Sequence, residues 1–314
     1  MTYCATLWMA PLMVLLPSLG MAHISSEAVS GRVALIGQPL KRRHSEIMHN
    51  AAFDHFGVES RYELRETPVS ELPDFFAEVR QGGWLGFQVT APHKQAVIEF
   101  VDSITTAAEA IGAVNSGAVL PDGSLEGFNT DAAGFAAALT EDLGATIESS
   151  RIVVAGAGGA ARAVVWALLT GGADQVVIGN RQPQRAEALA SDFADLGQVI
   201  GVDLQSAAFE EALGDADIAV NATTVGMTTD TMAFDPGLLP GSTHVFDLVY
   251  VPMETPLVAR ARSLDLRVRN GLDMLVRQAE IAFERWTGVT GSAPVMRTAL
   301  ESWMAEAPDS SERT

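Results

Sequence analysis

Residues 151–162 constrain the fold more than any other stretch, because a β-branched run breaks there into glycines and then into an alanine-rich segment. The glycines follow the pattern Gly156-x-Gly158-x-x-Ala161. Such a turn lets the backbone approach a pyrophosphate closely, and it aims the amides of a helix N-terminus at the negative charge. The pattern therefore predicts a bound dinucleotide.

The residues on either side of this turn support the prediction, since glycines alone are also compatible with a plain loop. Residues 152–155 are typical of a buried strand, 160–169 of a helix, and 175–179 of the next parallel strand. A βαβ unit without a ligand is the alternative. We expect the dinucleotide contacts to come from the turn itself, namely Gly156, Ala157, Gly158, Gly159 and Ala160.

The end of the second strand indicates which dinucleotide binds. An NAD site usually carries Asp or Glu there, about 20 residues after the glycines, to bind the ribose 2′-hydroxyl. This chain has Asn180 and Arg181 instead, with Arg185 one turn further on. Two guanidinium groups favour a 2′-phosphate, which a carboxylate would repel. We therefore predict NADP, the alternative being that both arginines are solvated charges at a helix start.

Length, composition and charge limit the number of domains and the kinds of partner that this chain can have. At 314 residues with 48% hydrophobic residues, the chain can bury a sizeable core and is long enough for two domains. It has 20 basic and 39 acidic residues, a net charge of −19, which argues against nucleic acid or an anionic membrane as a partner. The positive charge for an anionic cofactor must then be concentrated locally, as it is in Arg181 and Arg185.

Residues 1–30 stand apart from the rest of the chain. An apolar run there is similar to a signal peptide, but no Lys or Arg precedes Arg32 and prolines interrupt the run. Our hypothesis is an N-terminal extension with Met21 as the working initiator. The only cysteine, Cys4, lies in this segment, so we predict no disulfide and no metal site in the body, which fits a reducing cytoplasm.

The body divides into two α/β regions. Residues 31–130, joined by 271–306, are expected to form a substrate-binding domain, and residues 131–270 a dinucleotide-binding domain. An acidic tail over 307–314 has the composition of a disordered segment. Ligands of doubly wound sheets bind beyond the carboxyl ends of the strands, so the substrate is expected in the cleft between the two regions.

Hydrophobic patterning predicts the elements of both regions. In the first region we expect strands over 32–36, 60–64 and 86–89, helices over 44–56, 70–81 and 93–101, and a hairpin over 117–120 and 124–128 around Asp122-Gly123. Later in the chain we expect a helix over 131–143, strands over 218–221 and 244–248, and closing helices over 273–288 and 293–305.

Two strand ends of the first region carry side chains suited to catalysis. Lys94 follows the strand over 86–89, and Asp131 follows the second strand of the hairpin. A lysine beside a carboxylate can hold a substrate hydroxyl and relay its proton during hydride transfer, with the carboxylate fixing orientation and charge. Taken separately, Lys94 is compatible with a solvated lysine and Asp131 with a helix N-cap. Together they are our candidates for the catalytic residues.

These features belong to a longer series of short motifs. The series is Gly37-Gln-Pro39, His44-Ser45, Val89-Thr90-x-Pro92-x-Lys94, Ala113-Val114-Asn115, Asn129-Thr130-Asp131, Gly156-Ala-Gly-Gly-Ala160, Asn180-Arg181, Asn221-Ala-Thr223 and Gly271-Leu-x-Met274-Leu-Val276-x-Gln278. With these motifs in unbroken order over roughly 31–290, the chain resembles the shikimate dehydrogenase family.

The resemblance implies an α/β protein in which an N-terminal α/β substrate domain precedes a Rossmann-type doubly wound NADP-binding domain. It also implies C-terminal helices that return to the first domain. The activity it implies is the NADP-dependent, reversible reduction of 3-dehydroshikimate to shikimate, in the route to chorismate and the aromatic amino acids.

The resemblance further implies roles for individual residues. Lys94 and Asp131 match the catalytic pair of the family. Substrate contacts are implied for Ser45, Thr90, Asn115, Tyr250 and Gln278. Beyond the glycine turn, cofactor contacts are implied for Asn180, Arg181, Arg185, Asn221, Thr223, Gly271 and Met274.

The expected substrate pocket departs from the family pattern. The family usually reads His-Ser-x-Ser-Pro, whose serines donate to the substrate carboxylate, whereas this chain reads Lys-Arg-Arg-His-Ser-Glu over 41–46. An ungapped alignment puts Arg43 in place of the first serine and keeps Ser45, and a gapped one loses the second serine. Arg43 is then either a bidentate ligand of the carboxylate or a surface charge. Gln88, which we also expect among the substrate-binding residues, stands where the family generally has Asn, and Asp273 stands where it often has Gly.

These departures leave the identity of the acid open. Quinate, an amino-shikimate or another cyclic polyhydroxy acid is an alternative substrate. A non-catalytic regulator that binds NADP is an alternative function, against which the presence of both Lys94 and Asp131 speaks. A binding protein outside the cytoplasm ranks last, because it would lack a supply of NADP. We expect a small-molecule substrate, a cytoplasmic location and a monomer or homodimer.

Overall fold

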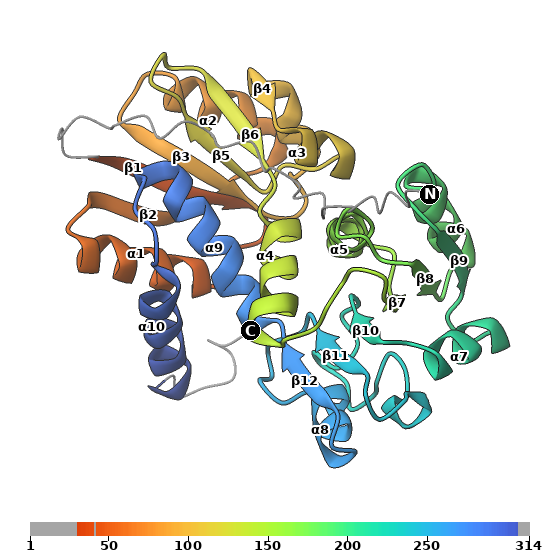
Figure 1. Cartoon of the computed structure of the whole chain (residues 1–314). Helices are drawn as coiled ribbons and strands as arrows, with labels where there is room; N and C mark the ends of the chain where they lie inside the picture. Colours follow the sequence, from red (N-terminus) through yellow and green to blue (C-terminus); the bar gives the residue numbers. More distant parts are fainter. Residues whose placement is uncertain (1–29, 41, 307–314) are drawn as a thin grey trace, which may run out of the picture.

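The structure, a computed structural model, describes residues 30–40 and 42–306. Within them the chain forms two six-stranded sheets, and its last two helices return to the first sheet (Figure 1). The predicted extension with Cys4 and Met21 and the predicted tail over 307–314 lie outside the described residues. None of the described helices combines the length and the apolar character that crossing a bilayer requires.

The first sheet contains β1 (Ser30–Gly37), β2 (Glu59–Glu66), β3 (Trp84–Val89), β4 (Ser103–Ile104), β5 (Ser116–Val119) and β6 (Leu125–Phe128). Their order in space is β2-β1-β3-β5-β6-β4. β1 runs parallel to β2 and β3, while β5 pairs antiparallel with β3 and with β6. The hairpin predicted around Asp122-Gly123 is therefore confirmed.

Helices pack on both faces of this sheet because successive strand residues point to opposite sides. The helices of this region are α1 (His44–Phe56), α2 (Leu72–Val79), α3 (Thr106–Ile111), α9 (Leu272–Thr287) and α10 (Ala293–Glu306). On one face Val33 shares a core with Phe53 of α1 and Phe283 of α9. On the other face its neighbour Ala34 shares a core with Phe75 of α2.

The second sheet contains β7 (Arg151–Ala155), β8 (Gln175–Asn180), β9 (Val199–Asp203), β10 (Ile218–Asn221), β11 (His244–Asp247) and β12 (Arg267–Asn270). All neighbouring pairs are parallel, in the order β9-β8-β7-β10-β11-β12. One face carries α5 (Gly159–Thr170) and α6 (Pro183–Asp192), and the other carries α7 (Ala207–Gly214) and α8 (Pro256–Ser263). Because both faces are covered, residues 152–155 of β7 are all apolar and buried. The predicted Rossmann-type, doubly wound sheet is confirmed.

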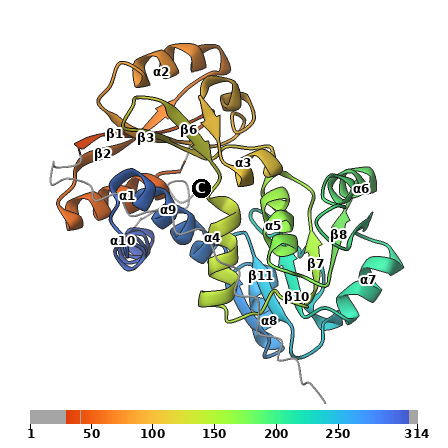
Figure 2. The ribbon, with the colours of Figure 1, turned by 45° about the horizontal axis from the view of Figure 1, so that its top comes forward.

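Two helices carry the chain between the sheets and lie side by side, α4 (Asp131–Ala137) and α9 (Figure 2). Their contact is close because Gly134 faces Gln278, where an added Cβ would lie 2.7 Å from the Gln278 backbone nitrogen. Just beyond α4, Arg277 of α9 donates twice to the Asp142 carboxylate, at 2.9 and 3.1 Å. The junction of the two regions is therefore both tightly packed and ion-paired.

Two predicted helices differ from the structure. Over 93–101 the chain forms a turn and then a short 3₁₀ helix (Ala96–Phe100), because the Lys94 carbonyl accepts from the Val114 amide instead of from its own helix. The predicted helix over 131–143 is α4 only as far as Ala137, and a π-helical turn follows over Ala138–Asp142. Further 3₁₀ turns occupy Val69–Glu71 and Pro236–Leu238.

Candidate active site

A cavity of about 540 Å³ lies between the ends of β1 and β3 and the segments that follow β7, β11 and β12. Its lining from the first sheet and the adjoining loops includes Ser45, Gln88, Thr90, Lys94, Asn115 and Asp131. Its lining from later in the chain includes Ala160, Tyr250, Gly271, Met274 and Gln278. Residues predicted from separate motifs therefore meet around one space.

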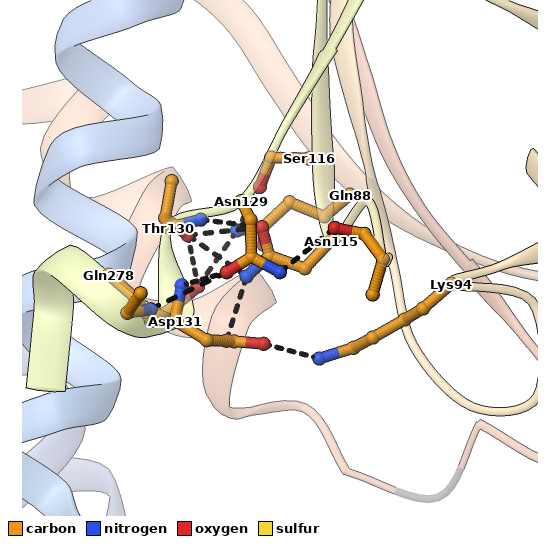
Figure 3. A network of polar contacts seen from close by, with 10 residues as sticks. Gln88, Lys94, Asn115, Ser116, Asn129, Thr130, Asp131 and Gln278 are labelled. Atoms are coloured by element: carbon orange, nitrogen blue, oxygen red, sulfur yellow. Dashed lines mark hydrogen bonds and ion pairs between the residues drawn. The ribbon is translucent and has the colours of Figure 1, made fainter. Parts of the chain in front are cut away.

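Lys94 and Asp131 form an ion pair in the wall of this cavity (Figure 3). Nζ of Lys94 donates to Oδ2 of Asp131 at 2.6 Å. Lys94 lies in the turn after β3 and Asp131 is the first residue of α4, so two separate strand ends bring them together. The side chains are 33% and 16% exposed, so a molecule in the cavity can reach both.

Neighbouring amides fix the Asp131 carboxylate. Nδ2 of Asn115 donates to Oδ1 of Asp131 at 2.7 Å, and the Asp131 backbone amide donates to Oδ1 of Asn129 at 2.9 Å. The Thr130 amide in turn donates to Oδ1 of Asn115 at 2.8 Å, which settles the direction of the Asn115 side chain. Each carboxylate oxygen of Asp131 thus has its own donor, and Oδ2 stays directed at Lys94.

A buried network continues from this pair into the first sheet (Figure 3). Oε1 of Gln278 accepts from the Thr130 hydroxyl at 3.3 Å and from Nε2 of Gln88 at 3.2 Å. Oε1 of Gln88 accepts from the hydroxyl of Tyr62 at 2.5 Å. Burial raises the pKa of Tyr62 above its ordinary value, so this hydroxyl remains a donor. The network fixes the amide direction of both glutamines.

The loop between β1 and α1 forms another part of the cavity wall. Arg42 and Ser45, the second residue of α1, line the cavity, whereas Arg43 is not part of the lining: its Nε donates to Glu46 at 2.7 Å and its side chain is 62% exposed. His44 is buried, and its ring centroid lies 5.4 Å from that of Tyr250. Of the two arginines, the one that faces the cavity is therefore Arg42.

The turn after β7 fits a ligand that approaches the backbone. Gly156 has a φ of +117°, and an added Cβ would lie 2.7 Å from the Ala222 carbonyl oxygen, so this position requires glycine. At Gly158 and Gly159 an added Cβ would meet nothing within 4 Å, which leaves the space beside the backbone open. α5 begins at Gly159, and the first amides of a helix have no partner within it. These residues fit a pyrophosphate.

Positive charge lies at the tip of the neighbouring strand. Asn180 ends β8, Arg181 follows it, and Arg185 lies in the first turn of α6. Both arginines are exposed, and β8 pairs directly with β7, which leads into the glycine turn. This edge of the sheet fits a phosphate on the ribose.

The remaining predicted cofactor residues have different surroundings. Asn221 is fully buried, with Nδ2 donating to Asp247 at 2.8 Å and Oδ1 accepting from the Thr223 hydroxyl at 2.7 Å. These two residues shape the loop that packs on the glycine turn. Gly271 and Met274 line the cavity, and the Leu248 carbonyl leaves no room for a side chain at Gly271.

Two further residues near the site, Arg42 and Tyr62, are not predicted by the sequence patterns. Arg42 belongs to a basic run at 41–43, a signal that marks the loop without telling which arginine faces inward. Tyr62 lies in the middle of β2 and is 26 residues from its partner Gln88, so no local pattern marks it.

Three family models match successive parts of the chain. Residues 35–116 match the shikimate dehydrogenase substrate binding domain, residues 138–230 match the shikimate / quinate 5-dehydrogenase family, and residues 271–301 match the shikimate 5′-dehydrogenase C-terminal domain.

Individual relatives match most of the chain. The shikimate dehydrogenase (NADP(+)) of Symbiobacterium thermophilum is 42% identical over 276 residues, which cover 86% of this chain and 93% of the relative. The structure of shikimate 5-dehydrogenase from Thermus thermophilus in complex with NADP(H) and shikimate has a TM-score of 0.77 at 37% identity, with 87% and 99% of the two chains covered. Quinate dehydrogenase from Corynebacterium glutamicum in complex with NAD has a TM-score of 0.79 at 32% identity, with the same coverage. The chain belongs to the shikimate dehydrogenase family.

Proposed function

We propose that the chain catalyses the reversible, NADP-dependent reduction of 3-dehydroshikimate to shikimate. The observation that carries the proposal is the Lys94–Asp131 pair, because the cavity it faces is also lined by Ala160 of the glycine turn. A proton-transfer group and a dinucleotide turn at one cavity are the two parts that hydride transfer at an alcohol needs. The named relatives support the same reaction.

Oxidation of a secondary alcohol removes a hydride from carbon and a proton from oxygen. NADP held at the glycine turn would supply the hydride acceptor for this oxidation, and the reduced cofactor would supply the hydride for the reverse reaction. In its neutral form Lys94 accepts a hydrogen bond from the substrate hydroxyl and takes its proton as the carbonyl forms, which makes Lys94 the ammonium group that pairs with Asp131. Asp131, fixed by Asn115, stabilises the positive charge of Lys94 and keeps Nζ directed at the cavity. In the reduction Lys94 gives the proton back to the oxygen of the developing alkoxide.

Polar groups around the cavity bind the rest of the substrate in this proposal. The proposed contacts are Ser45, Thr90, Asn115, Tyr250 and Gln278, all of which line the cavity. Gln88 is only 3% exposed and is held by Tyr62, so its part is to orient the Gln278 amide.

The cofactor is held by the second sheet in this proposal. Its pyrophosphate fits the turn over 156–160, and its 2′-phosphate fits Arg181 and Arg185 beside Asn180. Gly271 and Met274 flank the part of the cavity that the nicotinamide ring enters. Asn221 and Thr223 support the glycine turn from the neighbouring loop.

The proposal includes the cellular location, the partners and the oligomeric state of the enzyme. We place it in the cytoplasm, where NADP is supplied and where a chain with Cys4 as its only cysteine needs no disulfide. The net charge of −19 argues against a nucleic-acid partner. Its state is a monomer or a homodimer.

Initial-rate assays of the purified full chain test the function, with shikimate or quinate as substrate and NADP or NAD as cofactor. We expect kcat/KM to be highest for shikimate with NADP, by a factor of about 10 or more over each alternative pairing. No turnover of shikimate with either cofactor would overturn the proposal. A higher kcat/KM for quinate would replace shikimate by quinate as the substrate.

A further inference from the structure

Arg42 gives the cavity a second cation. Among the residues that the structure describes, the charged ones of the lining are Arg42, Lys94 and Asp131, in a chain whose net charge is −19. Lys94 and Asp131 offset each other at 2.6 Å, and Lys94 is assigned to proton transfer. A guanidinium at another wall of the same cavity favours a substrate that carries an anionic group, because a buried anion needs a cationic or hydrogen-bonding partner.

Contacts with two loops of the second sheet fix the position of the Arg42 guanidinium. Its Nη2 lies 3.2 Å from Sδ of Met227, in the loop after β10, and its central carbon lies 5.7 Å from the ring centroid of Tyr250, after β11. Ser45 lines the same cavity. A guanidinium has five N–H donors, so Arg42 can keep its protein contacts and still present two donors to a carboxylate.

The neighbouring His44 responds to this charge but does not add to it. Burial, and then the charge of Arg42, lower the pKa of His44 to about 4, so the ring is neutral near neutral pH. Its Nε2 is buried and has no hydrogen-bond partner in the part of the chain that the structure describes. Of the residues described at 30–40 and 42–306, Arg42 is therefore the cation that an anionic group meets at this wall.

We propose that Arg42 binds the substrate carboxylate in a bidentate manner and so selects a cyclic acid over a neutral cyclic polyol. The inference rests on the proposed function, which puts the reacting hydroxyl at Lys94. Lys94 and Arg42 then hold two different ends of the substrate, the first for proton transfer and the second for binding. The hydroxyls of Ser45 and Tyr250 lie on the same cavity and complete the carboxylate site.

The test compares shikimate with its methyl ester, which keeps the ring hydroxyls and lacks the charge. NADP-linked oxidation of both is measured for the unchanged chain, Arg42→Gln, Arg42→Lys and Arg43→Gln. Arg61→Gln is the matched control, because Arg61 is an exposed residue of β2 that pairs with Asp54. We expect Arg42→Gln to lower kcat/KM about 100-fold for shikimate, mainly through KM, and less than about threefold for the ester. Arg42→Lys keeps the positive charge but lacks the two parallel N–H donors of a guanidinium, so its kcat/KM for shikimate should fall about 10-fold.

If Arg42→Gln lowered kcat/KM equally for shikimate and for the methyl ester, the inference would be overturned, because the role of Arg42 would then be structural. An unchanged preference for the acid in Arg42→Gln would also overturn it, as would a selective loss that appears in Arg43→Gln instead. NADP affinity and the midpoint of thermal unfolding show whether each variant is folded. If Arg42→Gln does not fold, the same comparison of the two substrates is made with Arg42→Lys. Failure of the proposed function looks different, since the unchanged chain would then oxidise neither shikimate nor the ester.

Discussion

The hydroxyl of Tyr62 lies 2.5 Å from Oε1 of Gln88, and this contact decides which way the Gln88 amide faces. With Oε1 occupied, Nε2 of Gln88 is left to donate to Gln278, whose side chain lines the cavity. A residue in the middle of a buried strand thus sets the orientation of a group at the candidate active site. Its effect is one of positioning, since nothing places Tyr62 itself in the cavity lining.

We predict that Tyr62→Phe lowers the free energy of unfolding by about 1 to 3 kcal/mol, because Oε1 of Gln88 becomes a buried acceptor without its donor. KM for shikimate should rise severalfold while kcat changes little, since Gln278 loses its fixed orientation. Denaturant unfolding and initial rates measure the two effects. Tyr62→Phe combined with Gln88→Leu should cost less than the sum of the single changes, and strict additivity would contradict the coupling.

We predict that Lys94→Ala lowers kcat about 100-fold or more, because the group that takes the proton of the substrate hydroxyl is removed. NADP affinity, measured by fluorescence titration, should change little. Asp131→Asn keeps the shape of the side chain and removes its charge, and it should lower kcat by about 10-fold or more. A kcat for Lys94→Ala equal to that of the unchanged chain would exclude Lys94 from the chemistry.

We predict that replacing Arg181 and Arg185 together by Ala raises KM for NADP about 100-fold, since charge-assisted hydrogen bonds to the 2′-phosphate are lost. KM for NAD, which has no such phosphate, should change by less than about twofold. Arg151→Ala serves as the control, because Arg151 is a half-exposed arginine paired with Asp215. An equal rise in KM for both cofactors would contradict a role in phosphate recognition.

The glycine turn allows a paired prediction. Gly156→Ala should lower the free energy of unfolding by about 1 to 3 kcal/mol or more, because its φ of +117° and the nearby Ala222 carbonyl both oppose a side chain. Gly158→Ala meets no protein atom within 4 Å, so it should leave stability almost unchanged and raise KM for NADP instead. Thermal unfolding and initial rates separate the two effects. The reverse pattern would mean that the open space does not receive the cofactor.

His49 makes the stability of the fold depend on pH. It is fully buried in α1, and burial lowers its pKa from the usual 6.5 to about 3. Between these two values the unfolded chain binds a proton that the folded chain does not, so stability is complete above about pH 6.5 and is lost as the pH falls toward 3. At pH 4.5 the loss from this one residue is about 3 kcal/mol.

Denaturant unfolding at pH 7 and pH 4.5 measures this effect. The fall in stability between the two pH values should be smaller in His49→Phe by about 3 kcal/mol. His55→Gln is the control, because His55 is exposed on the same helix and should leave the fall unchanged. Equal falls in His49→Phe and the unchanged chain would contradict the prediction.

The cofactor half of the fold could be predicted because its signals are local. β7, the glycine turn and α5 occupy consecutive residues over 151–170, and a strand covered on both faces must be apolar throughout. The edge strand β12 reads Arg-Val-Arg-Asn, and β4 has two residues, so neither has a pattern that distinguishes it from a loop. The domain bounds at 131 and 270 stay a prediction.

The candidate site could be predicted only where its residues lie at strand ends. Lys94 and Asp131 stand out in this way, since parallel strands bring their carboxyl ends to one edge. Arg42 and Arg43 are adjacent and chemically identical, and only the turn into α1 decides that Arg42 faces the cavity. Tyr62 acts through a partner on another strand, and such pairing depends on the packing of the complete sheet.

The contact between Gly134 and Gln278 packs α4 closely against α9 between the two sheets, so we expect a rotation of one sheet relative to the other to turn about these helices. Asp131 starts one of these helices and Gln278 lies on the other, so in the proposed function the groups around the transferred proton lie at this axis, while the glycine turn lies on the second sheet. A rotation of the second sheet about this axis changes the distance between Gly158 and Lys94 and preserves the hydrogen bonds of Asp131. Under the proposed function, the geometry for proton transfer is then fixed when the chain folds, whereas the geometry for hydride transfer depends on the angle between the two sheets.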